Sequence, residues 1–183
     1  MKQTSSAYIF KIADTEEEFS QIHKLNYKTF VEEIPQKDRN KDRILIDEFH
    51  KENTYFICKT GRELIGMLAL RGQRPFSLDK KIADLDRYLP SDIKPCEIRM
   101  LSIVDRYRYS MILLGLFKAL RPIVKEKYDV ILISGYEKKM KLYTHMGFQP
   151  FAYKVGKENA LYQPMFLRTE HIRRLDPLID RYT

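Results

Sequence analysis

The chain has 183 residues, of which 44% are hydrophobic and 32% are charged. This length suits one domain, and the composition excludes a largely disordered or fibrous chain. Lys and Arg number 33 against 25 Asp and Glu, a formal net charge of +8, which favours an acidic partner such as nucleic acid, an anionic membrane, a phosphorylated cofactor or an acidic protein.

The first predicted elements are a short strand over 8–12 and a helix that begins after Thr15. Thr15 followed three residues later by Glu18 is the pattern of a capping box. Apolar residues recur at helical spacing as far as Phe30, and Pro35 ends the helix.

Predicted elements then continue with a short helix over 44–50 and a hairpin made of strands over 54–59 and 64–71. A helical insert follows at about 72–95, with its helix over 78–88. Large apolar residues of the insert either line a pocket for an acyl chain or pin the insert to the core, and we favour the second. These residues are Phe76, Leu78, Ile82, Leu85 and Leu89.

The remaining predicted elements alternate between strand and helix. They are a strand over 97–104, a helix over 110–127, a strand over 129–134, a short helix over 137–146 that Gly147 ends, and a final pair of strands over 148–155 and 161–167. This order of elements predicts an α/β unit without a dividing linker.

Neither a membrane span nor a metal site is expected. The apolar stretches are far shorter than the roughly 18 residues that a membrane span needs, and the polar first residues do not resemble a secretory signal, so we expect a cytoplasmic protein. Cys58 and Cys96 have neither CxxC spacing nor a His cluster beside them. We therefore expect both to be buried, reduced thiols.

The most specific segment is Leu142-Tyr143-Thr144-His145-Met146-Gly147-Phe148. A helix that ends in Tyr-x-x-x-Gly-Phe between two strands resembles the motif that closes the acyl-CoA site of the GNAT superfamily of N-acyltransferases. The order of elements over about 8–167 is similar to that fold. The resemblance implies one α/β (α+β) domain over 1–183 with a mixed central sheet of about six to seven strands flanked by helices.

The resemblance makes Tyr143 the acid that protonates the leaving thiolate. The residues alone fit equally well a core tyrosine at a helix end, where Gly147 supplies a positive φ. His145 occupies a variable position of the motif and is expected at the surface.

A second segment, over 103–112, lies where a strand gives way to a long helix, so free backbone N–H groups and the helix dipole can receive a pyrophosphate. The resemblance makes this corner the phosphate-binding site. The superfamily usually carries R/Q-x-x-G-x-G/A here, whereas the chain from Arg108 has neither glycine. An asparagine often found seven residues before the family's tyrosine is Tyr136 here. The expected donor contacts are Ile103, Val104, Arg106, Arg108, Tyr109, Ser110 and Met111.

Two segments resemble a branch of this fold that often takes its acyl group from an acyl carrier protein, the acyl-homoserine-lactone synthases and N-acyl amino acid synthases. Residues 25–33 are similar to the first-helix pattern of that branch, although Asn26 replaces an arginine, and they make Phe30 a candidate substrate contact. Glu97-Ile98-Arg99-Met100 resembles the acid and arginine that open the central strand. Many relatives place this arginine three residues after the acid rather than two.

Because side chains alternate along a strand, Glu97 and Arg99 share one face and can form an ion pair. Glu97 is the candidate base that removes a proton from the acceptor amine, directly or through water, and Arg99 is a candidate substrate contact. Burial would raise the pKa of Glu97 as a base requires, whereas Arg99 would lower it. A purely structural ion pair remains the alternative.

The resemblance implies an N-acyltransferase that moves an acyl group from a phosphopantetheine thioester, either acyl-CoA or an acyl carrier protein, to an amine by direct attack. The acceptor is a small molecule or an amino acid, and a bulge or splay in the strand over 97–104 offers N–H groups to the oxyanion. The acyl-CoA or acyl-phosphopantetheine is a co-substrate, and no metal takes part.

Two other functions compete with this one. A non-catalytic relative that binds a thioester or carrier protein would explain the missing glycines. Nucleic-acid binding is disfavoured because acidic residues interrupt the basic run over 37–43 and no binding motif accompanies it. An excess of positive charge over 105–128 favours docking of an acidic carrier protein.

Overall fold

The computed structural model describes residues 7–108, 111–157 and 160–175, the side chains of 173–175 excepted. Its strands are β1 (Tyr8–Ile12), β2 (Thr54–Thr60), β3 (Glu63–Arg71), β4 (Pro95–Ile103), β5 (Val130–Tyr136), β6 (Gln149–Pro150), β7 (Val155–Lys157) and β8 (Ala160–Arg168). Its helices are α1 (Glu16–Tyr27), α2 (Ile112–Lys127) and α3 (Met140–His145), with shorter helical segments η1 (Lys28–Glu33), η2 (Leu85–Tyr88), η3 (Asp105–Tyr107), η4 (Glu137–Lys139) and η5 (Thr169–Leu175).

The strands form one mixed sheet in the order β1-β2-β3-β4-β5-β8-β6, with β7 also beside β8. β4 and β5 run parallel, and the other neighbours in this sheet pair in antiparallel fashion. The predicted fold class is therefore confirmed. Among the described residues the sheet has eight strands where six to seven were expected, because the single strand expected over 148–155 is replaced by two short strands, β6 and β7, that each pair with β8.

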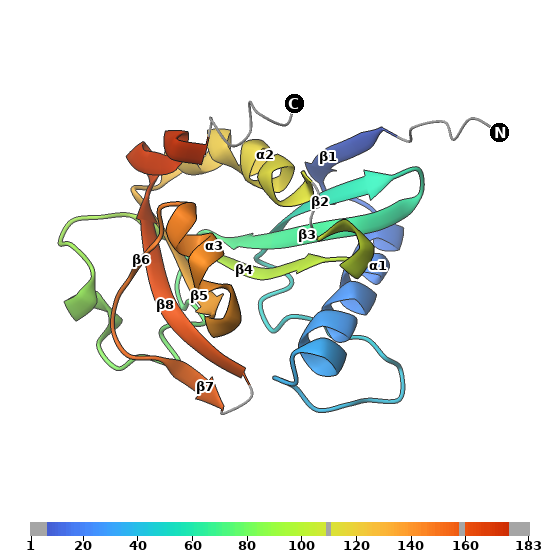
Figure 1. Ribbon diagram of the computed structural model, residues 1–183, viewed down its shortest axis with the longest axis horizontal. Coiled ribbons are helices and arrows are strands. Elements are labelled where there is room, and N and C mark those ends of the chain that lie inside the picture. Colours follow the sequence, from blue (N-terminus) through green and yellow to red (C-terminus); the bar gives the residue numbers. More distant parts are fainter. Residues whose placement is uncertain (1–6, 109–110, 158–159, 176–183) are drawn as a thin grey trace.

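Helices cover both faces of this sheet (Figure 1). One core cluster joins α2 to the sheet, with Met146 and Phe148 after α3 in the same cluster. A second cluster joins α1 to the opposite face of β2 and β3. The third cluster buries the apolar residues of the insert against β5 and β8, on that same opposite face. The expectation that these residues pin the insert to the core is thus supported by their burial.

Two predicted helices are wrong. The insert, between β3 and β4, forms turns and the short η2 instead of a helix over 78–88, and residues 44–50 are irregular over 44–47 and form a turn over 48–50. Within the insert, Asp84 adopts a left-handed backbone with φ +51°. One continuous α-helix therefore cannot run from 78 to 88. The apolar spacing that suggested a helix arises from burial against the sheet, so tertiary packing and not helical periodicity sets it.

The predicted N-cap Thr15 at the start of α1 is confirmed, and the reciprocal bond of the capping box goes to the residue before it. Thr15 Oγ1 accepts a hydrogen bond from the backbone N–H of Glu18 at 3.2 Å, and the Glu18 carboxylate accepts one from the N–H of Asp14 at 3.1 Å. The same buried carboxylate pairs with Lys59 on β2 at 2.9 Å and with Lys11 on β1 at 3.2 Å. Glu18 therefore fixes the N-terminus of α1 to the edge of the sheet.

A bulge interrupts β4 and opens the sheet. The pairing register with β3 shifts beside Met100, which has a left-handed φ of +52°, and one extra residue is accommodated there. The pairing of β4 with β5 ends at Ile98 opposite Ile133. The rest of β4 therefore diverges from β5, and the predicted bulge and splay are both present.

Cys58 and Cys96 are buried and unbonded to each other, as expected. Among the described residues, no helix is long and apolar enough to cross a membrane.

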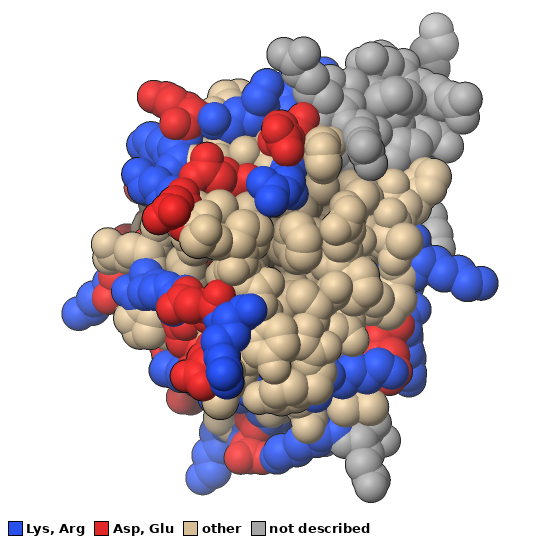
Figure 2. All heavy atoms as spheres, turned by 90° about the vertical axis from the view of Figure 1, so that its left-hand side faces the viewer, with Lys and Arg blue, Asp and Glu red and all other residues tan. Residues whose placement is uncertain are grey.

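Figure 2 shows the side of the molecule on which β6 and the insert lie. Uncharged residues occupy the middle of this face, and basic and acidic side chains are interspersed toward its edges. The net charge of +8 does not gather there into one continuous positive surface, as nucleic-acid binding would favour.

Candidate active site

A cavity of about 410 Å³ lies where β4 and β5 separate. It brings together residues from η1, the insert, β4, α2, β5, η4, α3 and β8. Six of the residues expected at the site line it: Phe30, Glu97, Arg99, Ile103, Arg108 and Tyr143.

The cavity has two chemically different halves. Leu101, Phe117 and Ile133 line it on the α2 face of the sheet and belong to the apolar core or pack against it. The opposite face supplies polar groups instead. They are Ser77, Lys81, Glu97 and Arg99. An occupant that spans both faces between β4 and β5 would meet an apolar environment at one end and a charged one at the other.

Tyr143 lies on α3, which ends as the sequence predicts. Gly147 has φ +92°, and the N–H of Phe148 donates to the carbonyl of Tyr143 at 3.0 Å. The ring of Tyr143 lies against the backbone of Gly135 on β5. Burial raises the pKa of the Tyr143 hydroxyl above its usual 10.0, and a backbone hydrogen bond from Tyr136 partly offsets that shift. His145 is exposed, as expected.

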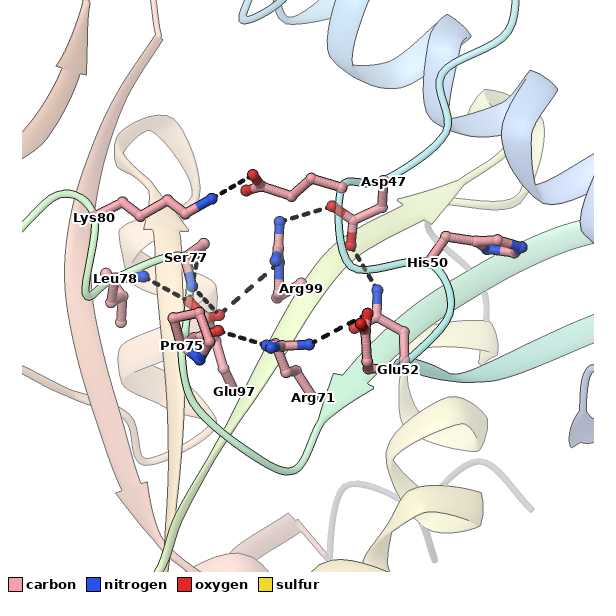
Figure 3. Close-up of polar contacts among 12 residues, drawn as sticks. Asp47, His50, Glu52, Arg71, Pro75, Ser77, Leu78, Lys80, Glu97 and Arg99 are labelled. Carbon is pink, nitrogen blue, oxygen red and sulfur yellow. Dashed lines mark hydrogen bonds and ion pairs between the residues drawn. The ribbon is translucent and has the colours of Figure 1, made fainter.

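The Glu97 carboxylate is fully buried and faces the start of the insert (Figure 3). It accepts hydrogen bonds from the backbone N–H of Ser77 at 2.7 Å, from Ser77 Oγ at 2.6 Å and from the N–H of Leu78 at 3.2 Å. Burial is the largest influence and raises the pKa of the Glu97 carboxyl above its usual 4.5. The charge of Arg99, the hydrogen bonds from Ser77 and the charge of Lys81 act in the opposite direction but do not cancel the shift. Glu97 thus anchors the first turn of the insert, which the sequence did not reveal.

Arg99 joins the site to the loop before β2. Its Nε lies 3.9 Å from the Glu97 carboxylate, as their spacing predicts, and its Nη2 lies 2.9 Å from Asp47. The Arg99 guanidinium lies 4.5 Å from the centroid of the Phe49 ring. The guanidinium of Arg71, a residue of β3, lies 3.8 Å from the same centroid. Sequence reasoning missed Asp47, Phe49 and Arg71, because the first two lie in an irregular loop without any motif.

The predicted donor corner is only partly in the cavity. Arg108 lines it, but its guanidinium donates to the carbonyl of Ile103, to Asp105 and to Glu33. Arg106 is exposed and pairs with Glu63 at 2.6 Å. Tyr109 and Ser110 lie outside the described residues. Val104 and Met111 are not among the residues that line the cavity.

Within the residues that the structure describes, no group of three or more His, Cys, Asp or Glu side chains is arranged to hold a metal ion.

Comparison with known proteins identifies related folds. A family model described as an acetyltransferase (GNAT) domain matches residues 25–118. No curated protein matches the chain in sequence. Among solved structures, FeeM, an N-acyl amino acid synthase from uncultured soil microbes, is 17% identical with a TM-score of 0.74, and the match covers 97% of this chain and 99% of FeeM.

Two synthases of another kind are also similar. BjaI, a CoA-dependent acyl-homoserine lactone synthase, is 19% identical with a TM-score of 0.77, over 96% of this chain and 90% of BjaI. The acyl-homoserine-lactone synthase LasI is 16% identical with a TM-score of 0.67, over 90% of this chain and 91% of LasI. At these identities the likeness establishes a shared fold.

Proposed function

Because the chain belongs to the GNAT family of acetyltransferases, we propose that it is an N-acyltransferase that moves an acyl group from a phosphopantetheine thioester to an amine by direct attack. The observation that carries this proposal is the cavity between β4 and β5, in which Tyr143, Glu97, Arg99 and Phe30 meet. A thioester threaded between the two strands would place its carbonyl between an apolar face and a polar face.

The geometry suits each part of such a reaction. The apolar half around Leu113 and Phe117 suits the acyl chain. Beyond Ile98, no strand of the described residues pairs with β4 on its β5 side, so backbone N–H groups that point to that side are able to stabilise the oxyanion. Tyr143, whose raised pKa keeps its hydroxyl protonated at neutral pH, supplies the proton that the leaving thiolate takes.

The donor is proposed to be an acyl carrier protein in preference to acyl-CoA. Arg108 already has three partners, and neither pyrophosphate-loop glycine is present, which disfavours the usual CoA contact. The related BjaI is described as CoA-dependent, so acyl-CoA is the alternative donor. An acidic carrier protein would add attraction to the basic residues of 105–128, and its capture should weaken as salt rises.

The proposal is tested by incubating the protein with acyl-CoAs and acylated carrier proteins of graded chain length and with a panel of amines, amino acids included. Thiol release and mass spectrometry of N-acylated products are the two readouts. We expect turnover with at least one pair and a loss of about 100-fold in Tyr143→Phe. Absence of thiol release across the panel would contradict the proposal.

A non-catalytic binding module is the second candidate, favoured by the occupied guanidinium of Arg108. It predicts that the protein binds an acylated carrier without turnover and that Tyr143→Phe changes the binding affinity alone. Isothermal titration with the donor, run beside the thiol assay, separates the two functions.

A further inference from the structure

We propose that Lys81, held at the cavity by the insert, is the base that accepts the proton of the acceptor amine, and that Glu97 is a positioning residue. This inference rests on the proposed N-acyl transfer and concerns its proton-transfer step. It replaces the sequence-based assignment of the base to Glu97 with a different side chain of the same cavity.

Glu97 is poorly placed to exchange protons with a substrate. Its side chain has 1% exposure, and each of its carboxylate oxygens accepts at least one hydrogen bond from Ser77 or Leu78. A base must come within hydrogen-bond reach of the proton that it removes. For Glu97 this would require breaking the contacts that hold the first turn of the insert (Figure 3).

Lys81 lies at the end of that same turn. Its backbone N–H donates to the carbonyl of Leu78 at 3.0 Å, and its own carbonyl accepts a hydrogen bond from the hydroxyl of Tyr153 at 3.4 Å. The insert is thus held on both sides of Lys81, by Glu97 at the start of the turn and by Tyr153 at its end. The backbone that carries the Lys81 side chain is therefore fixed relative to the sheet.

Lys81 is an exposed residue that lines the cavity. Its Nζ lies 6.0 Å from the centroid of the Tyr162 ring on β8, and Tyr162 lines the cavity together with Tyr143. An amine at this position is accessible to a substrate, whereas the Glu97 carboxylate is covered.

The surroundings of Lys81 favour its neutral form. Protein atoms packed around the amine partly desolvate it, which lowers the pKa of Lys81 below its usual 10.5, and the charges of Arg99 on β4 and of Lys37 in the loop after η1 lower it further. Glu97 and Glu48 act in the opposite direction. The remaining acid of the cavity, Glu33, is paired with Arg108. A neutral lysine is a competent general base near the pH at which it titrates.

The proton transfers balance with Lys81 in this role. The lone pair of the acceptor amine forms the new C–N bond to the thioester carbonyl, and one N–H proton passes to the neutral Nζ of Lys81. The C–S bond then breaks with its electron pair on sulfur, and the thiolate takes the hydroxyl proton of Tyr143. The Lys81 ammonium finally returns its proton, through water, to the Tyr143 phenolate, so that an amide and a thiol are the net products.

The test compares Lys81→Met and Lys81→Arg with the wild type, using the acyl donor and amine that the wild type turns over best and measuring kcat/KM against pH. Arg87→Met is the matched control, because it also removes one positive charge from the insert but lies in an exposed ion pair with Asp84. Arginine keeps the charge of Lys81 but cannot deprotonate, so it separates a base from a group that binds an anion.

We expect both Lys81 variants to lose about 100-fold in kcat/KM. In the plot of kcat/KM against pH, the rise that deprotonation of Lys81 produces should disappear, while the rise that deprotonation of the acceptor amine produces remains. Arg87→Met should match the wild type. Retained activity in Lys81→Arg, or an unchanged pH profile in Lys81→Met, would overturn the inference. A wild type that turns over no acyl donor would instead contradict the proposed function, so the two failures are distinct.

Discussion

The ring of Tyr143 on α3 lies directly on the backbone of Gly135 on β5. A Cβ atom added to Gly135 would be 3.0 Å from Cδ2 of the ring and 3.0 Å from the sulfur of Met165. Glycine at this position therefore sets how close α3 comes to the diverging strands, and hence where the Tyr143 hydroxyl lies in the cavity.

Gly135→Ala should displace the Tyr143 ring by a few tenths of an ångström and lower kcat by about 10-fold or more, since small displacements of a reacting group have large kinetic costs. Steady-state kinetics check this result. Adding Gly135→Ala to Tyr143→Ala should have little further effect on kcat, because the ring that the methyl group displaces is gone. An equal loss in both backgrounds would show that Gly135 acts independently of Tyr143.

Tyr143→Phe removes the proposed proton donor but keeps the ring, so we expect kcat to fall by about 100-fold with the fold unchanged. The pH dependence of kcat has a predicted direction as well. An acid works while it is protonated, and burial raises the pKa of Tyr143 above 10.0, so any loss of wild-type rate caused by its ionisation should begin above pH 10. A falling limb near neutral pH would assign the acid to another group.

Ser77→Ala should loosen the insert. It removes the hydroxyl that hydrogen-bonds the buried Glu97 carboxyl group at 2.6 Å and leaves that buried oxygen with one partner fewer, a loss that costs about 1 to 3 kcal/mol. Denaturant unfolding should show this loss, and amide hydrogen exchange should quicken over the insert. Ser91→Ala, at an exposed position of the same insert, should change neither measurement. Equal exchange in both variants would contradict the anchoring role of Glu97.

The charge network at the start of α1 should make stability depend on pH. Burial acts to raise the pKa of Glu18, but hydrogen bonds from Lys59, the Asp14 N–H and Lys11 outweigh it and lower that pKa from 4.5 to about 2. A lowered pKa gives stability that is present above pH 4.5 and is lost as pH falls toward 2. This contribution is at most about 3 kcal/mol.

Glu18→Gln should therefore lower the free energy of unfolding at pH 7 and flatten its decline between pH 5 and pH 2, as measured by urea unfolding. Glu17→Gln is the control, because Glu17 is exposed in the same helical turn and shares its helix-dipole position. If Glu17→Gln flattens the curve as much as Glu18→Gln, the effect belongs to the helix dipole and not to the ion pairs with Lys59 and Lys11.

Local signals made much of the fold predictable. The capping pair Thr15 and Glu18 and the positive φ at Gly147 each depend on a few neighbouring residues, and each is present. The β-branched and aromatic residues of 54–59 and the apolar run of 64–71 likewise located β2 and β3. The helix expected over 78–88 failed because the burial of Leu78, like that of its apolar neighbours, is imposed by the distant strands β5 and β8.

The site was predictable where it followed a motif. Tyr143, Glu97 and Arg99 were named from the sequence and line one cavity. Lys81 and Asp47 were not named, because one lies in the insert and the other in an irregular loop, and their relation to β4 arises from long-range contacts alone. No spacing rule links residues that are far apart in the chain, so the polar half of the cavity required the structure.

The extra residue at Met100 divides β4 into two segments whose side-chain alternation is out of phase. Before it, Ile98 faces α2 while Glu97 faces the insert; after it, the odd-numbered Leu101 and Ile103 face α2. The polar half of the cavity thus takes Glu97 and Arg99 from the segment before Met100, whereas the apolar half takes Leu101 and Ile103 from the segment after it and Ile98 from the segment before it. Under the proposed function, variation at Leu101 and Ile103 would therefore reshape the wall offered to the acyl chain without altering the side chains that face the insert, which makes this end of β4 a separate target for redesigning specificity.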